Sequence, residues 1–257
     1  MVSPKSLVTF DRIDAGRVHA VFTTRHGGYS QGIFASANLS FAVGDDATSV
    51  RSNRAAVAEA LDISPAWTTV RQVHSASVYD GTPDPSGRGF LIPTEVAVPA
   101  DRLPEADAIV TKMQRQPICV MSADCLPIFV ASDGCLAVIH AGWRGLAAGV
   151  IERTIEALPR ADATAWLGPS IGPCHFEVGK DVPAAFEASR PTAPRFDAER
   201  AGSLYFDLRA AARWVLSSFG VETPDVEPPC TFCDQRFFSY RRDGPMTGRQ
   251  GLVAWID

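Results

Sequence analysis

The sequence has no long apolar segment, no internal repeat and no excess of basic residues. No segment approaches the run of about 20 apolar residues that spans a bilayer. Residues 1–17 mix charged with apolar side chains, unlike a signal peptide. The chain carries 24 basic and 29 acidic side chains, for a net charge of -5, which argues against a large nucleic-acid-binding surface. We therefore expect a soluble cytoplasmic protein that binds neither membranes nor nucleic acids.

Histidine and cysteine are also scarce, with five and six residues in the 257-residue chain. Without an export signal, the cysteines are expected to be reduced thiols, most of them buried, and not a disulfide framework. Apolar residues make up 46% of the chain and charged residues 21%, which is typical of a globular protein with a sizeable core. The few histidines therefore carry much of the information about a reactive site.

Apolar segments of strand length alternate with segments of helical periodicity along the chain. We expect strands at residues 18–23, 69–73, 108–110, 118–121, 128–131, 136–139 and 252–256, and helices at 48–61, 146–158 and 208–219. Two stretches rich in proline, glycine, alanine and charge, Asp80–Pro104 and Ala188–Ser203, are expected to be loops. Because strands and helices interleave, we predict a single α/β (α+β) domain over residues 1–257, with a mixed β-sheet covered by helices.

The strongest local signal is a predicted β-hairpin. Asp133 and Gly134 separate two strand-like segments and form a good hairpin turn. This hairpin places Cys125 just before its first strand and His140 at the end of its second, so the two residues should lie together. A helical stripe begins soon after His140, which puts this histidine at a strand-to-helix turn, where α/β proteins commonly place chemistry.

Cysteine and histidine together offer the thiolate and imidazole ligands that zinc or copper favours. His74, at the end of the expected strand 69–73, is the natural third ligand beside Cys125 and His140. Three protein ligands that leave a fourth position open are typical of a catalytic zinc site. The same cysteine and histidine could instead form a thiolate–imidazole pair for nucleophilic catalysis. The residues alone leave both interpretations open.

The other cysteine and histidine motifs give weaker signals. Cys230 and Cys233 form a single CxxC motif, with no second CxxC and no following His-x-x-x-His, so they do not predict a structural zinc site. Cys174 and His175 are adjacent, and in an extended chain their side chains would point to opposite faces. At most one of them should then face the site, with His175 as the reserve ligand.

Several arginines are suited to binding a small anion, since the planar guanidinium group matches phosphate and nearby glycines allow backbone N–H groups to approach it. Arg25 stands beside a glycine pair, and Arg144 lies in the turn after His140. Arg241 lies in a basic segment that is followed by Arg249. We expect a phosphate group among these arginines.

Taken together, the motifs resemble the YfiH family, which is also described as laccase-domain polyphenol oxidases and as purine nucleoside phosphorylases with adenosine deaminase activity. The resemblance runs over nearly the whole chain. The segments that carry it are Thr23–Gly28 (TTRHGG), Gln72–Ser75 (QVHS), Ala106–Ala108 (ADA), Ala123–Pro127 (ADCLP), His140–Gly145 (HAGWRG), Gly168–Pro173 (GPSIGP) and Phe237–Gly244 (FFSYRRDG).

This resemblance implies a metal, usually zinc with copper as the alternative, held by His74, Cys125 and His140. It implies phosphorolysis of adenosine, inosine, guanosine or methylthioadenosine to free base and sugar 1-phosphate, and hydrolytic deamination of adenosine. The partners are then purine nucleosides and phosphate, bound by a monomer or small homo-oligomer. We expect Asp124 to act as a proton shuttle. The residues expected to contact substrate or phosphate are Arg25, Asn38, Gln72, Arg144 and Arg241.

Three alternative functions are considered: a laccase, a Cys–His hydrolase and a non-catalytic binding protein. Laccase chemistry requires a blue-copper centre and a histidine-rich cluster for oxygen, and five histidines cannot supply both. A Cys–His hydrolase or amidase that edits peptidoglycan precursors is the main alternative, because the family's fold is also similar to cysteine hydrolases; its activity would be sensitive to alkylation and resistant to chelators. A non-catalytic protein would bind nucleoside without converting it.

Overall fold

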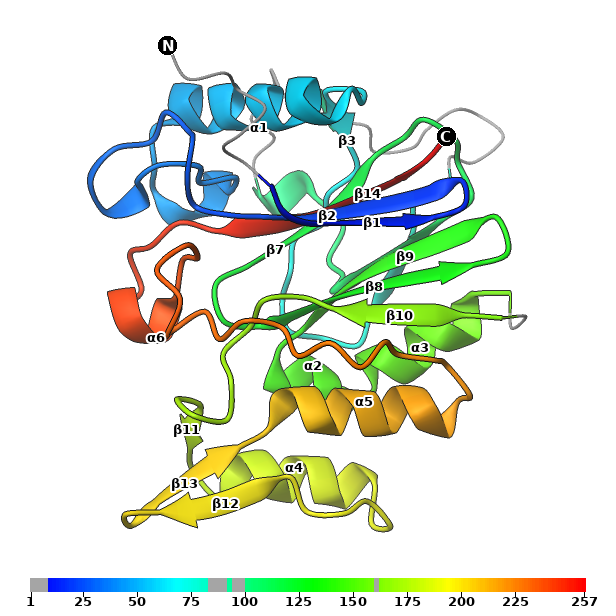
Figure 1. Cartoon of the computed structure of the whole chain (residues 1–257), viewed down its shortest axis with the longest axis vertical. Helices are drawn as coiled ribbons and strands as arrows, with labels where there is room; N and C mark the ends of the chain where they lie inside the picture. Colours follow the sequence, from blue (N-terminus) through cyan, green and yellow to red (C-terminus); the bar gives the residue numbers. More distant parts are fainter. Residues whose placement is uncertain (1–8, 83–91, 94–99, 160–161) are drawn as a thin grey trace.

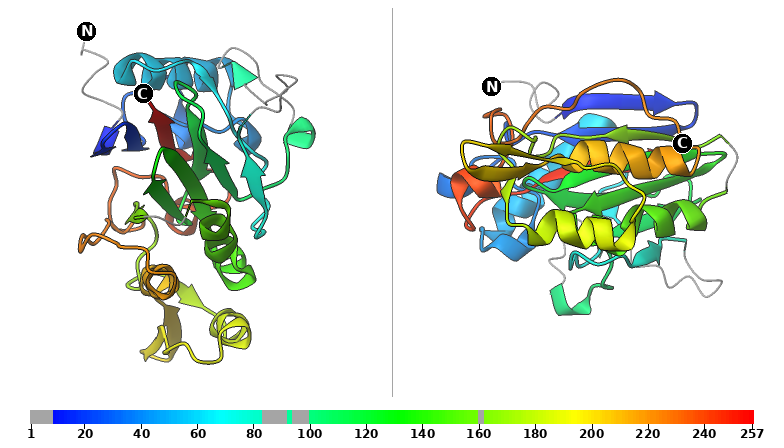
Figure 2. Two further views of the ribbon diagram at one scale, coloured as in Figure 1. Left: turned by 90° about the vertical axis from the view of Figure 1, so that its right-hand side faces the viewer. Right: turned by 90° about the horizontal axis from the view of Figure 1, so that it is seen from below.

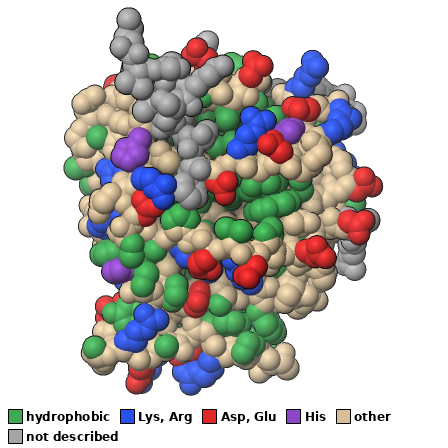
Figure 3. Space-filling model, viewed as in Figure 1, with side chains coloured by type: hydrophobic (Ala, Val, Ile, Leu, Met, Phe, Trp, Pro, Cys, Tyr) green, Lys and Arg blue, Asp and Glu red, His purple; other side chains and the backbone are tan. Residues whose placement is uncertain are grey.

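The computed structural model describes residues 9–82, 92–93, 100–159 and 162–257. Two β-sheets lie face to face between helices, and a smaller unit of strands and a helix extends from one side (Figures 1 and 2). Acidic and basic side chains are interspersed over the face drawn in Figure 3. The middle of the expected loop Asp80–Pro104 lies outside the described residues.

The first sheet has four antiparallel strands in the order β1-β2-β14-β7. Its strands are β1 (Thr9–Ala15), β2 (Val18–Thr23), β7 (Ile118–Ser122) and β14 (Gln250–Ile256). Helix α1 (Ala47–Leu61) covers the outer face, where Val57 packs with Val21 and Val253. The helix begins at Asp46, whose carboxylate accepts a hydrogen bond from the Ser49 amide.

The second sheet has five strands in the order β10-β8-β9-β6-β4. They are β4 (Val78–Asp80), β6 (Ala108–Thr111), β8 (Leu126–Ser132), β9 (Cys135–Ala141) and β10 (Thr164–Leu167). Because β4 and β6 pair in parallel and the others are antiparallel, the sheet is mixed as expected. Phe129 and Val138 lie on its inner face and pack with Phe22 of the first sheet.

Helices cover the outer face of this second sheet (Figure 1). They are α2 (Trp143–Ala148), α3 (Val150–Ala157) and α5 (Leu208–Ser218). The smaller unit beside them consists of α4 (Asp181–Ser189) and the strands β11 (Glu177–Val178), β12 (Asp197–Arg200) and β13 (Ser203–Phe206). Among the described residues, no helix is long and apolar enough to cross a membrane.

Short elements complete the described chain. Strands β3 (Ala66–Trp67) and β5 (Ile92–Pro93) pair with each other. The 3-10 helices are η2 (Gly32–Phe34), η3 (Phe41–Val43) and η4 (Ala100–Arg102), and α6 (Tyr240–Asp243) is a single helical turn before the last strand.

The predicted hairpin is confirmed. Strands β8 and β9 pair from Ser132↔Cys135 at the turn to Leu126↔Ala141 at the open end. Gly134 in the two-residue turn has φ of +67°, a conformation that glycine adopts readily. The open end of the hairpin therefore holds Cys125 and His140 side by side, as the sequence predicts.

The predicted mixed α/β fold is confirmed, with its strands distributed over several sheets. Three predictions about local structure are wrong. The expected helix 146–158 is two helices, interrupted where Gly149 adopts φ of +92°. Part of the expected loop Ala188–Ser203 is strand β12, paired with β13. Residues 69–73 form only an isolated bridge, Arg71↔Glu105, and the Val73 amide donates to the Asp107 carboxylate instead of to a neighbouring strand.

Candidate metal centre and substrate pocket

A pocket of about 870 Å³ opens where the two sheets meet the helical layer. This size suits a small-molecule ligand. Among the described residues, its wall combines η3, residues 69–74, the β7–β8 connection, the end of β9, the start of α2 and α6. The polar and charged side chains that line it include Arg54, Gln72, His74, Asp124, Cys125, His140, Arg144, Arg241 and Arg249.

His74, Cys125 and His140 converge on the pocket wall, and their ligand atoms all lie within 4.8 Å of one another. The distance between His74 Nε2 and Cys125 Sγ is 3.7 Å. Two ligands at zinc–nitrogen and zinc–sulfur distances of about 2.0 and 2.3 Å, at a tetrahedral angle, lie roughly 3.6 Å apart. The three residues that the sequence predicts as metal ligands are therefore together, with spacing that fits zinc.

Asp107 organises two of these three ligands. Its carboxylate is fully buried and accepts a hydrogen bond from His140 Nδ1 at 2.9 Å. The same carboxylate accepts hydrogen bonds from the backbone amides of Val73, His74 and Ser75. Because Nδ1 of His140 is bound to the carboxylate, Nε2 remains to serve as a ligand, the usual arrangement around metal-binding histidines.

The backbone at His74 depends on the same carboxylate. His74 has φ of +59°, a left-handed conformation that is uncommon for residues other than glycine. The three successive amides that bind Asp107 hold this turn in place and direct the imidazole toward Cys125. No role for Asp107 was predicted from the sequence. A lone acidic residue between Ala106 and the buried strand β6 is the signal that could have found it.

The charges of Asp107, Cys125 and His140 affect one another's pKa values. Burial opposes the charged form of Asp107, but hydrogen bonds from His140 and Ser75 outweigh it and lower its pKa to about 2. Burial likewise opposes the thiolate of Cys125, but the positive charge of His140 and hydrogen bonds from both histidines lower its pKa to about 6. The pKa of His140 rises to about 9, against the effect of burial, because the Cys125 thiolate and Asp107 stabilise its imidazolium form.

These residues fit a metal ion. Imidazole and thiolate are favoured ligands of zinc and copper, and the hydrogen bond to Asp107 fixes the ligand orientation of His140. Without a metal, the same charges make Cys125 a thiolate beside an imidazolium, which is the arrangement of a cysteine nucleophile. The geometry therefore supports both of the chemistries that the sequence left open.

The pocket wall is rich in arginine. Arg54, Arg71, Arg144, Arg241 and Arg249 line it, whereas Asp124 is the one acidic residue among the described lining residues. Arg71 is paired with Glu105 outside the lining. Arg54 is buried, its guanidinium lies over the Phe41 ring, and no described carboxylate pairs with it; burial lowers its pKa to about 10. An excess of positive charge in a partly buried pocket favours an anionic ligand.

The arginines expected to bind phosphate lie in different environments. Arg144 is exposed on the pocket wall with its guanidinium over the Trp143 ring. Arg241 also lines the pocket and donates to the carbonyl oxygens of His175 and Glu177. Arg25 is not among the lining residues. Its side chain donates to the Ala35 carbonyl and pairs with Asp243 at 3.4 Å.

Gln72 and Asn38, both expected to contact substrate or phosphate, form hydrogen bonds within the protein around the pocket. Gln72 lines the pocket, but its amide donates to the Met121 carbonyl at 2.7 Å and accepts from the Met121 amide at 2.9 Å. Asn38 is fully buried and donates to Ser40 and Asp45. Its carbonyl oxygen accepts hydrogen bonds from the amides of Ser40 and Arg249. Asn38 thus holds together the loops that carry η3 and Arg249, and Gln72 fixes the segment before His74 to strand β7.

Asp124 connects the β7–β8 loop to the C-terminal part of the chain. One carboxylate oxygen accepts a hydrogen bond from Thr231 Oγ1 at 2.6 Å, and the other accepts from the Arg241 amide at 2.7 Å. Its φ of +93° is left-handed, like that of His74. Both oxygens are thus bound to protein groups, so the position of Arg241 in the pocket depends directly on Asp124.

His175, expected as a reserve ligand, does not join the centre at His74. Residues 173–175 form a turn, not an extended strand. Cys174 and His175 therefore both face Cys230 and Cys233, in a second cluster of donor atoms. The extended backbone on which the two side chains would point apart is therefore not present here.

Comparisons with known proteins match nearly the whole chain. The model of a family described as multi-copper polyphenol oxidoreductase laccase matches residues 19–257. A Pseudomonas aeruginosa protein named purine nucleoside phosphorylase is 40% identical over 247 residues, covering 93% of this chain and 94% of the relative. A crystal structure from Neisseria meningitidis has 37% identity and a TM-score of 0.80, covering 98% of this chain and 99% of that one. The Bacillus licheniformis YfiH structure has 26% identity and a TM-score of 0.79, covering 93% of each chain.

The charges at the centre predict unusual thiol reactivity in metal-free protein. We expect alkylation of Cys125 by iodoacetamide to be half-maximal near pH 6, because the thiolate is the reactive form and exists above its pKa. In Asp107→Asn, His140 loses the carboxylate that stabilises its imidazolium form, so the midpoint for Cys125 should move to higher pH. Mass spectrometry of the peptide containing Cys125 measures both profiles. A wild-type midpoint at the ordinary thiol pKa of about 8.5 would contradict the coupling.

Proposed function

The chain belongs to the laccase-domain family that includes YfiH, and on that premise we propose that its pocket catalyses phosphorolysis of purine nucleosides. The observation that carries the proposal is the position of the His74, Cys125 and His140 cluster in a pocket whose wall is rich in arginine. The relative named purine nucleoside phosphorylase covers nearly the whole chain. We further propose that the natural metal is zinc and that adenosine is also deaminated.

In phosphorolysis, an oxygen of phosphate bonds to C1′ of the sugar while the bond from C1′ to the purine breaks and its electron pair leaves with the base. Phosphate must therefore be held against C1′ as negative charge develops on the base. Arg144, Arg241 and Arg249 are suited to this task because they line the same pocket as the metal ligands. Arg249 lies close enough to Cys125 and Asp124 for their charges to affect its pKa, although burial lowers that pKa overall.

His74, Cys125 and His140 would hold the zinc ion, which would supply a Lewis acid and could lower the pKa of a bound water to about 7. Asp107 accepts a hydrogen bond from Nδ1 of His140, which leaves Nε2 of this histidine directed at the ligand cluster. Each carboxylate oxygen of Asp124, the residue expected to act as a proton shuttle, accepts a hydrogen bond, one from Thr231 and the other from the Arg241 amide. We propose that Asp124 positions the phosphate-binding Arg241.

Polyphenol oxidation by a multi-copper centre does not follow from the family description. Such chemistry requires a blue-copper site and a separate cluster of histidines for oxygen. The chain has five histidines, and the two donor clusters in the described residues contain three of them. We therefore propose nucleoside chemistry and not laccase chemistry for the centre at His140.

A cysteine hydrolase is the second candidate function, and one observation favours it. The lowered pKa of Cys125 and the raised pKa of His140 give a thiolate–imidazolium pair in metal-free protein. That pair would attack an acyl group such as an amide of a peptidoglycan precursor. A chelator distinguishes the two functions, because it should abolish the metal-dependent reaction and leave the hydrolase active.

Zinc-loaded protein should convert adenosine and phosphate to adenine and ribose 1-phosphate, with inosine as the product of deamination. Chromatography of the products and metal analysis of the same sample test this together. We expect His140→Ala to lose the metal and form no ribose 1-phosphate, because one of three ligands is gone. Metal-free wild-type protein that forms product at the full rate, or unchanged product formation by His140→Ala, would exclude the metal-dependent proposal.

The phosphate-binding role of the arginines is tested by the KM for phosphate. Arg249→Gln and Arg144→Gln should each raise it about tenfold, the effect of losing one charge-assisted hydrogen bond. The exposed Arg153 on α3 provides the matched control, and Arg153→Gln should leave this KM unchanged. If the pocket variants bind phosphate as well as Arg153→Gln does, phosphate lies elsewhere.

A further inference from the structure

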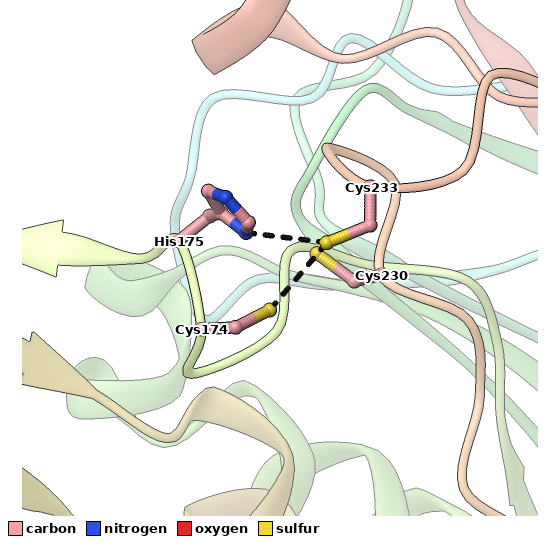
Figure 4. Close-up of side chains that lie close together, drawn as sticks. All are labelled: Cys174, His175, Cys230 and Cys233. Carbon is pink, nitrogen blue, oxygen red and sulfur yellow. Dashed lines mark hydrogen bonds between the residues drawn. The ribbon is translucent and has the colours of Figure 1, made fainter.

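We propose that Cys174, His175, Cys230 and Cys233 bind a second zinc ion, separate from the centre at His74, and that this ion has a structural role. The four donor atoms lie within 4.8 Å of one another (Figure 4). They come from two loops that are far apart in the sequence, one before β11 and one before α6. The proposal does not depend on which reaction the pocket catalyses.

The distances within the cluster fit tetrahedral coordination. Cys174 Sγ and Cys233 Sγ are 3.8 Å apart. Two thiolates at the zinc–sulfur distance of about 2.3 Å, at a tetrahedral angle, also lie about 3.8 Å apart. His175 Nδ1 lies 3.2 Å from Cys233 Sγ, a few tenths of an ångström closer than a shared zinc requires. Only a small outward shift of the imidazole is needed to admit the ion.

The backbone around Cys230 is arranged to support a thiolate ligand. The Gly172 amide donates a hydrogen bond to Cys230 Sγ at 3.2 Å. An N–H group directed at sulfur forms only a weak hydrogen bond with a neutral thiol, which is a poor acceptor, and a stronger one with a thiolate that binds a metal.

Neighbouring side chains fix the other ligands and the two loops. The His175 ring stacks on Phe232 with centroids 4.0 Å apart, which holds the imidazole beside the CxxC turn. The buried Arg209 donates to the carbonyl oxygens of Ser170 and Pro229, so it ties the two loops together just before their ligands. The cluster is thus held in place by contacts outside its four members.

The chemistry of the donor set identifies the metal and its role. Three cysteines and one histidine are a common ligand set of structural zinc sites, in which protein groups occupy all four positions. Cys174 and Cys233 are exposed, so zinc can reach the cluster from solvent. Because no position remains open for water or substrate, the ion would stabilise the fold and not act on a substrate.

The position of the cluster suggests what it stabilises. Thr231, between the two cysteines of the CxxC motif, donates to Asp124 in the pocket. Arg241 of the pocket donates to the carbonyl oxygen of the ligand His175. Zinc at the cluster would therefore fix the wall that presents Arg241, while His74, Cys125 and His140 hold their own metal independently.

Cobalt substitution in a Cys125→Ser variant tests the second site directly. This variant has no thiolate at the first centre, so any thiolate-to-cobalt charge-transfer band under reducing conditions must come from the second cluster. We expect an intense near-ultraviolet band, together with the strong visible bands of tetrahedral cobalt, and loss of both on adding zinc. Absence of these bands, or mass spectrometry showing a Cys174–Cys233 disulfide that persists under the same reducing conditions, would overturn the proposal.

Zinc content provides a second measurement on the full-length protein. Wild-type protein should hold one more zinc per chain than the Cys174→Ser/Cys233→Ser double variant, and Cys125→Ser should keep that additional ion. The double variant should melt at a lower temperature than wild type. Equal zinc content in the wild type and the double variant would contradict a metal at this cluster. If the double variant does not fold, the cobalt spectrum of Cys125→Ser decides the matter.

Discussion

The hydrogen bonds to the buried carboxylate of Asp107 determine the geometry of the candidate centre. This carboxylate binds His140 on strand β9 and the backbone amides of the turn that carries His74. The backbone of Asp107 also accepts a hydrogen bond from the His140 amide at 2.7 Å. Burying a carboxylate without hydrogen-bond partners would destabilise the folded protein. The Asp107 carboxylate instead accepts five hydrogen bonds, including one from the Ser75 hydroxyl. Two ligands from distant parts of the chain are thus oriented by a single side chain.

A second set of contacts holds the opposite side of the pocket. Asp124 accepts hydrogen bonds from Thr231 and from the amide of Arg241, and so joins the β7–β8 loop to α6. The proposed structural zinc at Cys230 lies directly behind this connection. The centre at His140 and the cluster at Cys230 would then have different tasks, since one faces the pocket and the other fixes part of its wall.

Local patterns in the sequence predicted much of the site. The hairpin from β8 to β9 follows from a two-residue turn between apolar strands, and it correctly places Cys125 beside His140. The strand end and the family resemblance both indicated His74 as the third ligand, but not how it reaches Cys125. Its approach depends on a left-handed turn and on a hydrogen bond to a residue 33 positions away.

Contacts between distant loops could not be predicted from spacing. Cys174 and Cys233 are separated by 59 residues, so a single CxxC motif gave no indication of its partners. The turn at residues 173–175, which lets both Cys174 and His175 face the cluster, was also unpredictable from alternation alone. Likewise, Arg25 resembles a phosphate ligand by its glycine neighbours, yet it pairs with Asp243 away from the pocket lining. The cytoplasmic location and the oligomeric state remain predictions.

We propose above all that Asp107 holds a metal centre that supports purine nucleoside phosphorolysis. Phosphorus NMR of inosine and inorganic phosphate, incubated with zinc-loaded wild-type protein or with Asp107→Asn, tests it most directly. Ribose 1-phosphate should appear with the wild type, and the variant should lose about 10- to 100-fold in both zinc affinity and rate. No ribose 1-phosphate from the zinc-loaded wild type, or an equal rate in the variant, would contradict the account.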